Sequence, residues 1–280
     1  MCNRIIIILL ILGISGQSSA QDNLLDSLDT DTNATTVWPS FKGLQIVSLQ
    51  STKMVGQGDL YFVVSHRFGS LKDGINTFFG LDNATTKLGF IYGIKNWVSI
   101  GISRHTLNKT YELAFKYRLI NQNENSLISL VGYNTIQISS QLDKDVYPQL
   151  SFQNRLSYTS QVLISRSLSK ALTIEVIVSY IHKNVYDPII ENQKQFSIGG
   201  GGRFKLSKRL SVNAEYMYSN KPSFYRNPLS LGLDIETGGH VFQLLFTNSQ
   251  GMTESSYLTN AAGDWGNGDV YFGFNLYRVF

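Results

Sequence analysis

Two serine–histidine pairs are the residues whose types and spacing could support nucleophilic catalysis. Ser103 and His105 lie two residues apart, so they share one face of a strand, and Ser65 directly precedes His66. Acyl transfer also needs a third group that orients the base, and the spacing identifies none. The sequence contains no His-Glu-x-x-His zinc motif. We therefore predict no catalytic residue, no metal site and no cofactor, and a lipid-modifying enzyme is only the third hypothesis.

A larger set of charged residues falls within strand-like segments, with both signs in near balance. On the more polar face of these segments lie Arg67, Lys87, Glu112, Lys116, Arg118, Arg155, Glu175, Arg203, Lys205, Glu215, Asp234 and Glu236. An Arg or Lys facing lipid at the bilayer midplane costs about 2 to 4 kcal/mol, so these residues are expected to face a lumen. They either line a passage for small polar solutes or form ion pairs that fill the lumen.

The segments that position these charges alternate apolar and polar residues with the period of a strand. Twelve are expected, at 59–68, 85–94, 97–105, 109–120, 126–139, 154–167, 171–182, 194–206, 209–219, 229–237, 240–248 and 268–280. Each is close to the roughly 9 to 11 residues that a tilted strand needs to cross a bilayer. The sequence thus predicts an all-β fold, a transmembrane antiparallel up-and-down barrel of about twelve strands.

The connections alternate in length along the chain. Those expected on the inner side are short, whereas those on the outer side, such as 69–84, 140–153 and 249–267, are nearly all longer. This asymmetry is typical of bacterial outer-membrane barrels. Two of the inner turns, at 168–174 and 206–212, have the same Leu-Ser-Lys form, which indicates a shared tight turn.

The last segment, 268–280, carries large apolar residues on one face and ends on an aromatic residue. We expect Phe272, Phe274, Leu276 and Phe280 to form the insertion signal that the barrel-assembly machinery reads, with outer-membrane lipid around the strand. The chain has 15 Tyr and 16 Phe, which suits aromatic girdles at the two membrane interfaces. Its formal charge of +4 is spread along the chain, so no nucleic-acid partner is expected.

The first forty residues differ in composition from the rest. Arg4, the apolar run 5–14 and the small residues 18–20 predict a signal peptide over 1–20, whose removal would take away Cys2, the only cysteine. Residues 21–40 contain four Asp and no basic residue, which predicts a flexible acidic periplasmic tail before a barrel domain over 41–280.

Two further features concern the wall and the mouth of the barrel. The glycines at 199–202 interrupt a strand pattern and predict a bend or the close approach of a loop or an inward aromatic side chain. Phe78, Phe79 and Trp265 place aromatic groups in outer connections, where they form either a lid over the mouth or a partner site.

Several blocks of the sequence carry a resemblance to a known family. The segments 41–49, 58–69, 78–85 and 108–119 resemble a Bacteroidetes-type outer-membrane β-barrel family of unknown function. The resemblance implies the fold and a Gram-negative outer-membrane location, and it implies no activity. We expect porin-like passage of small polar solutes, and the alternative is a closed barrel that serves as a structural or partner-binding platform. The oligomeric state stays open.

Overall fold

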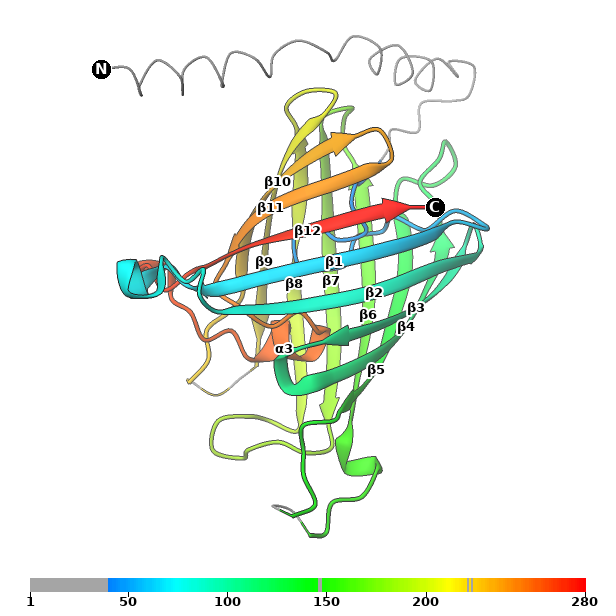
Figure 1. Cartoon of the computed structure of the whole chain (residues 1–280). Coiled ribbons are helices and arrows are strands. Elements are labelled where there is room, and N and C mark those ends of the chain that lie inside the picture. Colours follow the sequence, from blue (N-terminus) through cyan, green and yellow to red (C-terminus); the bar gives the residue numbers. More distant parts are fainter. Residues whose placement is uncertain (1–39, 146–147, 221, 223) are drawn as a thin grey trace, which may run out of the picture. The chain divides into compact units, whose positions relative to one another are not determined.

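The computed structural model describes residues 40–145, 148–220, 222 and 224–280, so the predicted signal peptide and nearly all of the acidic tail lie outside it. Twelve antiparallel strands form a closed barrel in which each strand pairs with its neighbours in sequence and β1 pairs with β12 (Figure 1). The strands are β1 Leu60–Ser70, β2 Ala84–Lys95, β3 Val98–His105, β4 Thr110–Ile120, β5 Ser129–Ser139, β6 Leu156–Ser167, β7 Leu172–Lys183, β8 Lys194–Lys205, β9 Leu210–Ser219, β10 Leu229–Thr237, β11 His240–Thr247 and β12 Tyr271–Val279. The predicted fold is confirmed.

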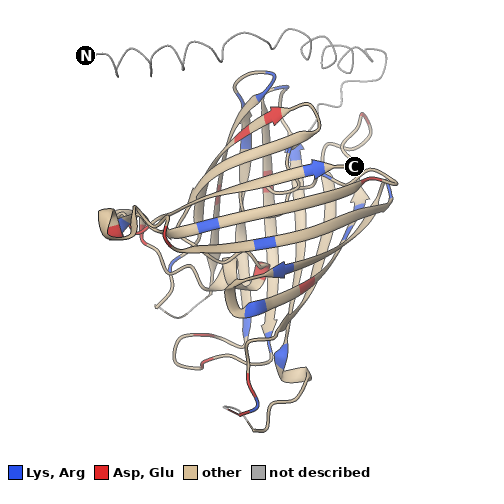
Figure 2. Cartoon of the chain, viewed as in Figure 1, with Lys and Arg blue, Asp and Glu red and all other residues tan. Residues whose placement is uncertain are grey.

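The strands alternate between two environments, as their sequences indicate. In β7, Glu175 and Ser179 are buried, whereas Val176 and Val178 between them are exposed on the outside of the wall. Because successive side chains of a strand point to opposite faces, one face of each strand meets the lumen and the other meets the surroundings. Figure 2 shows charges of both signs along the strands as well as in the connections.

The two ends of the barrel differ in the length of their connections. Short turns join β2 to β3, β6 to β7, β8 to β9 and β10 to β11, and we call this side the short-turn end. The opposite, long-loop end carries the 3-10 helices η1 Leu71–Thr77, η2 Leu107–Lys109, η3 Gln153–Arg155 and η4 Trp265–Asn267 and the α-helix α3 Glu254–Thr259. The predicted asymmetry is therefore present.

The two Leu-Ser-Lys segments form the same turn, for a local reason. The Oγ of Ser169 accepts a hydrogen bond from the backbone N–H of Leu172 at 3.0 Å, and the Oγ of Ser207 accepts one from Leu210 at 3.1 Å. Serine favours turns because its hydroxyl can bond nearby backbone groups. The repeat therefore reflects turn chemistry rather than a repeated binding unit.

The glycine run in β8 allows the wall to pack closely. A Cβ at Gly199 would lie 2.1 Å from the carbonyl oxygen of Tyr216 on β9, and a Cβ at Gly200 would lie 1.9 Å from that of Glu175 on β7. Both distances are far below van der Waals contact, so a side chain at either position would push a neighbouring strand away. The close approach at these glycines is therefore that of the neighbouring strands, and not that of a loop or an inward aromatic ring.

The closing strand has an aromatic outer face. The ring of Phe274 stacks on His66 of β1 with centroids 5.4 Å apart, and the ring of Phe272 stacks on Phe68 of β1 at 5.7 Å. Offset aromatic pairs contribute about 0.5 to 1.5 kcal/mol beyond the area they bury. These contacts strengthen the seam between the first and last strands, on the face where Leu276 also lies.

Candidate functional site

The lumen is occupied by residues 41–55, which precede the first strand and which we call the plug. The plug turns back on itself: a β-bridge joins Gln45 to Gln50, and the N–H of Ile46 donates to the carbonyl of Leu49 at 2.8 Å. The apolar side chains of the plug are buried against wall residues such as Leu163, Ile177, Met217 and Leu245. The plug therefore shares a hydrophobic core with the wall in the middle of an otherwise polar lumen.

One carboxylate holds the tip of the plug. Glu215 of β9 accepts hydrogen bonds from three consecutive backbone N–H groups, those of Val47 at 2.9 Å, Ser48 at 2.8 Å and Leu49 at 3.0 Å. Consecutive backbone N–H groups of this kind form a concave nest that suits an anion. The hydroxyl of Tyr257 in α3 donates a fourth bond to Glu215 at 2.7 Å, so the buried carboxylate is fully hydrogen-bonded.

Further wall residues satisfy the remaining polar groups of the plug. The amides of Gln243 and Asn275 donate to the carbonyls of Ile46 at 2.7 Å and Val47 at 2.8 Å. On the opposite wall, Glu175 accepts from the N–H of Thr52 at 2.8 Å. Buried backbone groups are costly unless they are paired, so these wall side chains make a lumen that fits this peptide.

Helix α3 reaches the plug from the long-loop end. Its residues Glu254, Tyr257 and Leu258 are buried, and the hydroxyl of its N-cap Thr253 accepts from the N–H of Ser256. Glu254 accepts a hydrogen bond at 2.9 Å from the side-chain amide of Gln50 in the plug. Through this bond and the bond from Tyr257 to Glu215, α3 and the plug form one connected structure.

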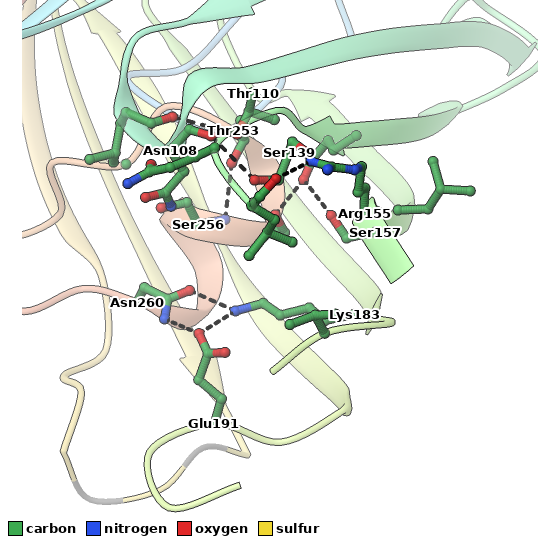
Figure 3. Close-up of a pocket in the computed structure, with 18 of the residues that line it drawn as sticks. Asn108, Thr110, Ser139, Arg155, Ser157, Lys183, Glu191, Thr253, Ser256 and Asn260 are labelled. Carbon is green, nitrogen blue, oxygen red and sulfur yellow. Dashed lines mark hydrogen bonds and ion pairs between the residues drawn. The ribbon is translucent and has the colours of Figure 1, made fainter. Parts of the chain in front are cut away.

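Beside α3, a cavity of about 680 Å³ lies at the long-loop end, and we call it the vestibule (Figure 3). The serine and threonine hydroxyl groups on its lining belong to Thr110, Ser139, Ser157, Thr253, Ser255 and Ser256. At its floor, the side-chain oxygen of Gln137 accepts hydrogen bonds from Ser157 and Ser255. Two cavities beside the plug measure about 30 Å³ each, which is room for about one or two water molecules.

The charged groups on one side of the vestibule form a closed network. The Nζ of Lys183 donates to Glu191 at 2.7 Å and to the side chain of Asn260 at 2.8 Å, and Asn260 donates to the same carboxylate. Burial tends to raise the pKa of Glu191, but Lys183 and the hydrogen bonds outweigh it and hold that pKa below its usual value. The network lies beside α3 and keeps both charges paired (Figure 3).

The serine–histidine pair on β3 does lie within hydrogen-bond reach, but its geometry differs from that of a catalytic triad. Ser103 Oγ is 3.0 Å from His105 Nε2, and a Glu112 oxygen is 3.7 Å from the same nitrogen. A triad carboxylate must instead bind the other ring nitrogen, and His105 Nδ1 has no hydrogen-bond partner among the described residues. Glu112 bonds Lys87 at 3.1 Å and Gln137 at 2.9 Å, so this cluster is an ion-pair network.

The structure places most of the charges that were assigned to the lumen inside the barrel. The buried members are Arg67, Lys87, Glu112, Lys116, Glu175, Arg203, Glu215 and Asp234. Arg118, Arg155, Lys205 and Glu236 are half-buried, and Arg155 belongs to η3 rather than to a strand. Some of these charged residues, such as Glu175 and Glu215, contact the plug. Lys87 and Glu112 pair with each other instead.

The three aromatic residues that were considered for a lid lie in the connections of the long-loop end, in or next to η1 and η4. Phe78 and Phe79, just after η1, are 61% and 53% exposed, and Trp265 is half-buried with its Nε1 donating to the carbonyl of Leu229. The buried side chains at this end include Glu254, Tyr257 and Leu258 of α3. Sequence reasoning missed both the plug and α3. Thr253, a helix-capping residue before Glu254, was the one available signal for α3.

A family model agrees with the barrel fold. A family model described as "Membrane bound beta barrel domain (DUF5777)" matches residues 41–280. Among solved structures, the KdgM porin is 10% identical and matches with a TM-score of 0.47 over 79% of this chain and 99% of its own. An outer membrane channel from Pseudomonas putida F1 is 12% identical, with a TM-score of 0.46 over 81% and 97%. Omp33 of Acinetobacter baumannii is 10% identical, with a TM-score of 0.40 over 80% and 99%. No curated protein matches.

Proposed function

The chain belongs to the family of membrane-bound β-barrel domains and lies in the Gram-negative outer membrane, and on that premise we propose that it passes small polar solutes when the plug moves aside. One observation carries this proposal: the lumen is blocked by a segment that is not part of the wall, whereas much of the inner face of the wall is polar, apart from the apolar patch that packs on the plug. Small polar side chains such as Ser65, Thr135, Ser179 and Asn213 face the lumen from different strands. A twelve-stranded wall is wider than an eight-stranded wall, which its own side chains fill.

A permanently closed barrel is the second candidate. The observation that favours it is the apolar packing of Ile46, Val47 and Leu49 against the wall, because such contacts stabilise the closed state. In that case the barrel would be a structural or partner-binding platform. The two candidates differ in one measurable property, which is whether the plug leaves the lumen while the barrel stays folded.

A reversible cross-link between plug and wall separates the two candidates. A Cβ at Gly232 of β10 would lie 3.1 Å from Cγ2 of Val47, which is near the spacing that a disulfide requires. In a Cys2→Ser background, the double variant Val47→Cys/Gly232→Cys should conduct in a planar bilayer only after reduction. Oxidation should abolish the openings because it fixes the plug in the lumen.

Single Gly232→Cys protein is the matched control, since it carries the same wall substitution and has no partner thiol. Its openings should not respond to reductant. Current steps that persist in the fully oxidised double variant would show that solutes do not pass through the space that the plug leaves. If neither wild-type protein nor the reduced double variant conducts, although the barrel is shown to be folded, the closed platform would be favoured.

The contact between α3 and the plug should make opening depend on pH. Burial, followed by repulsion from Glu112, raises the pKa of Glu254 to about 7 from 4.5, although Lys87 opposes this shift. Lys116 and Glu215 also face this group from the wall. The closed state therefore favours protonated Glu254. That stabilisation is complete below the unfolded pKa and is lost as the pH rises through about 7.

We expect openings to be more frequent at about pH 8 than at about pH 6, because ionised Glu254 is disfavoured in the closed state. Glu254→Gln keeps a neutral side chain of similar shape and should flatten this pH profile. Glu191→Gln in the vestibule network is the control and should leave the profile in place. A wild-type profile that is flat between these two values would contradict the role given to Glu254.

A further inference from the structure

The vestibule is polar but carries no excess of either charge. Its lining contains Arg155, Lys183, Asp143 and Glu191, so two cations face two carboxylates. Lys183 and Glu191 neutralise each other directly. The guanidinium of Arg155 is held by the backbone carbonyls of Ser139 and Leu142. An anionic or cationic ligand would therefore find no cluster of opposite charge here.

The other polar groups of the vestibule are hydroxyls and amides. Besides the six serine and threonine residues, the lining has the amides of Asn108, Gln137, Gln141, Asn154, Gln250 and Asn260. The amides of Gln137 and Asn260 are already bonded within the protein. The other amides offer donors and an acceptor, and a hydroxyl can act in either role. A ligand that carries many hydroxyl groups, each of them both donor and acceptor, is the best chemical match for such a lining.

Two aromatic rings and the size of the vestibule further limit the class of ligand that would fit it. Tyr225 and Tyr271 line the vestibule, and an aromatic ring offers a flat apolar face to the C–H groups of a bound molecule. The cavity volume of about 680 Å³ is within the range of about 300 to 1,000 Å³ that small-molecule sites usually have. We propose that the vestibule binds a neutral polyhydroxylated solute of the saccharide class, an inference that rests on the proposed passage and names its cargo.

Helix α3 connects this site to the plug. Ser255 and Ser256 line the vestibule, whereas Glu254 and Tyr257 of the same helix bond Gln50 and Glu215 on the other side. A solute that draws α3 toward the vestibule weakens both of these bonds. Binding on the long-loop side then favours release of the plug.

Isothermal titration of the refolded full chain in detergent tests the ligand class directly. The matched probes are glucose, glucuronate and glucosamine, which share one ring and differ in charge, together with the neutral disaccharide maltose. We expect saturable binding of the neutral sugars and weaker binding of the two charged ones. Tyr225→Ala and Tyr271→Ala should each weaken neutral-sugar binding by up to about tenfold. Tyr218→Ala removes a tyrosine from the outside of β9 and should leave binding unchanged.

The titration measures binding of sugars and not current, so its results test the vestibule site independently of the proposed passage. Tighter binding of glucuronate or glucosamine than of glucose would overturn the neutral class. Equal loss of binding in Tyr218→Ala and Tyr225→Ala would place the sugar outside the vestibule, and absence of binding by all four probes would overturn the site. None of these results would alter the redox-controlled openings of the cross-linked barrel, which test passage alone.

Discussion

Deletion of residues 41–55 should convert an intermittently open barrel into a continuously conducting one. A minor conformation is commonly populated at about 0.1 to 10%, so removal of the plug should raise the mean current per molecule by about ten- to a thousandfold. The wall side chains that now bind the plug, such as Glu175, Gln243 and Asn275, would then line a water-filled passage. Planar-bilayer recording of the deletion variant beside wild-type protein measures this change.

The control for the deletion is the fold of the barrel itself. Heat-modifiable gel mobility and the circular dichroism of the strands must match those of wild type before the current is compared. A deletion variant that is folded but silent would show that other side chains close the lumen. Such a result would remove the passage proposal and leave the closed platform.

Replacement of Glu215 by Gln should release the plug without removing it. The carboxylate accepts three backbone N–H bonds and one from Tyr257, and Gln offers a single acceptor oxygen beside an amide that would face N–H donors. Each buried N–H that is left without an acceptor costs about 1 to 3 kcal/mol. That cost falls mainly on docking of the plug, because the plug supplies three of the four donors.

Hydrogen exchange of the plug amides measures this loss. We expect those of residues 46–49 to lose protection by a factor of about a hundred or more, while the strand amides stay protected. Glu236→Gln is the matched control, since it makes the same change in a partly exposed pair with Lys42 at 2.8 Å, and such pairs contribute about 1 kcal/mol or less. Equal protection in wild type and Glu215→Gln would show that apolar packing alone holds the plug.

The wall of the barrel could be predicted from sequence because its pattern is local. In β7 the contrast between Glu175 and Val176 follows from which side each residue faces, and that side is fixed by the period of the strand. The turns follow the same logic, since Ser169 and Ser207 act on residues three positions away. The family match is confirmed over 41–280, and the Bacteroidetes attribution stays a prediction.

The plug and α3 could not be predicted because their partners are far away in sequence. Val47 meets Glu215 across 168 residues, and neither periodicity nor composition shows such a contact. The segment 41–49 was assigned to the barrel domain. It lies inside the lumen and forms no strand, so its apolar and polar residues do not alternate as those of the wall do. The proximity of Ser103 to Glu112 could have been derived, since the two residues pair directly in the β3–β4 register.

The position of the plug immediately before β1 also constrains the order in which the molecule assembles. Residues 41–55 lie inside a wall whose two edges, β1 and β12, meet only when the last strand is in place. A folded wall would have to reopen to admit the segment from the side, so the strands are best arranged around it before the edges join. The plug is then enclosed as the wall closes, so substitutions in it are expected to affect assembly as well as closure.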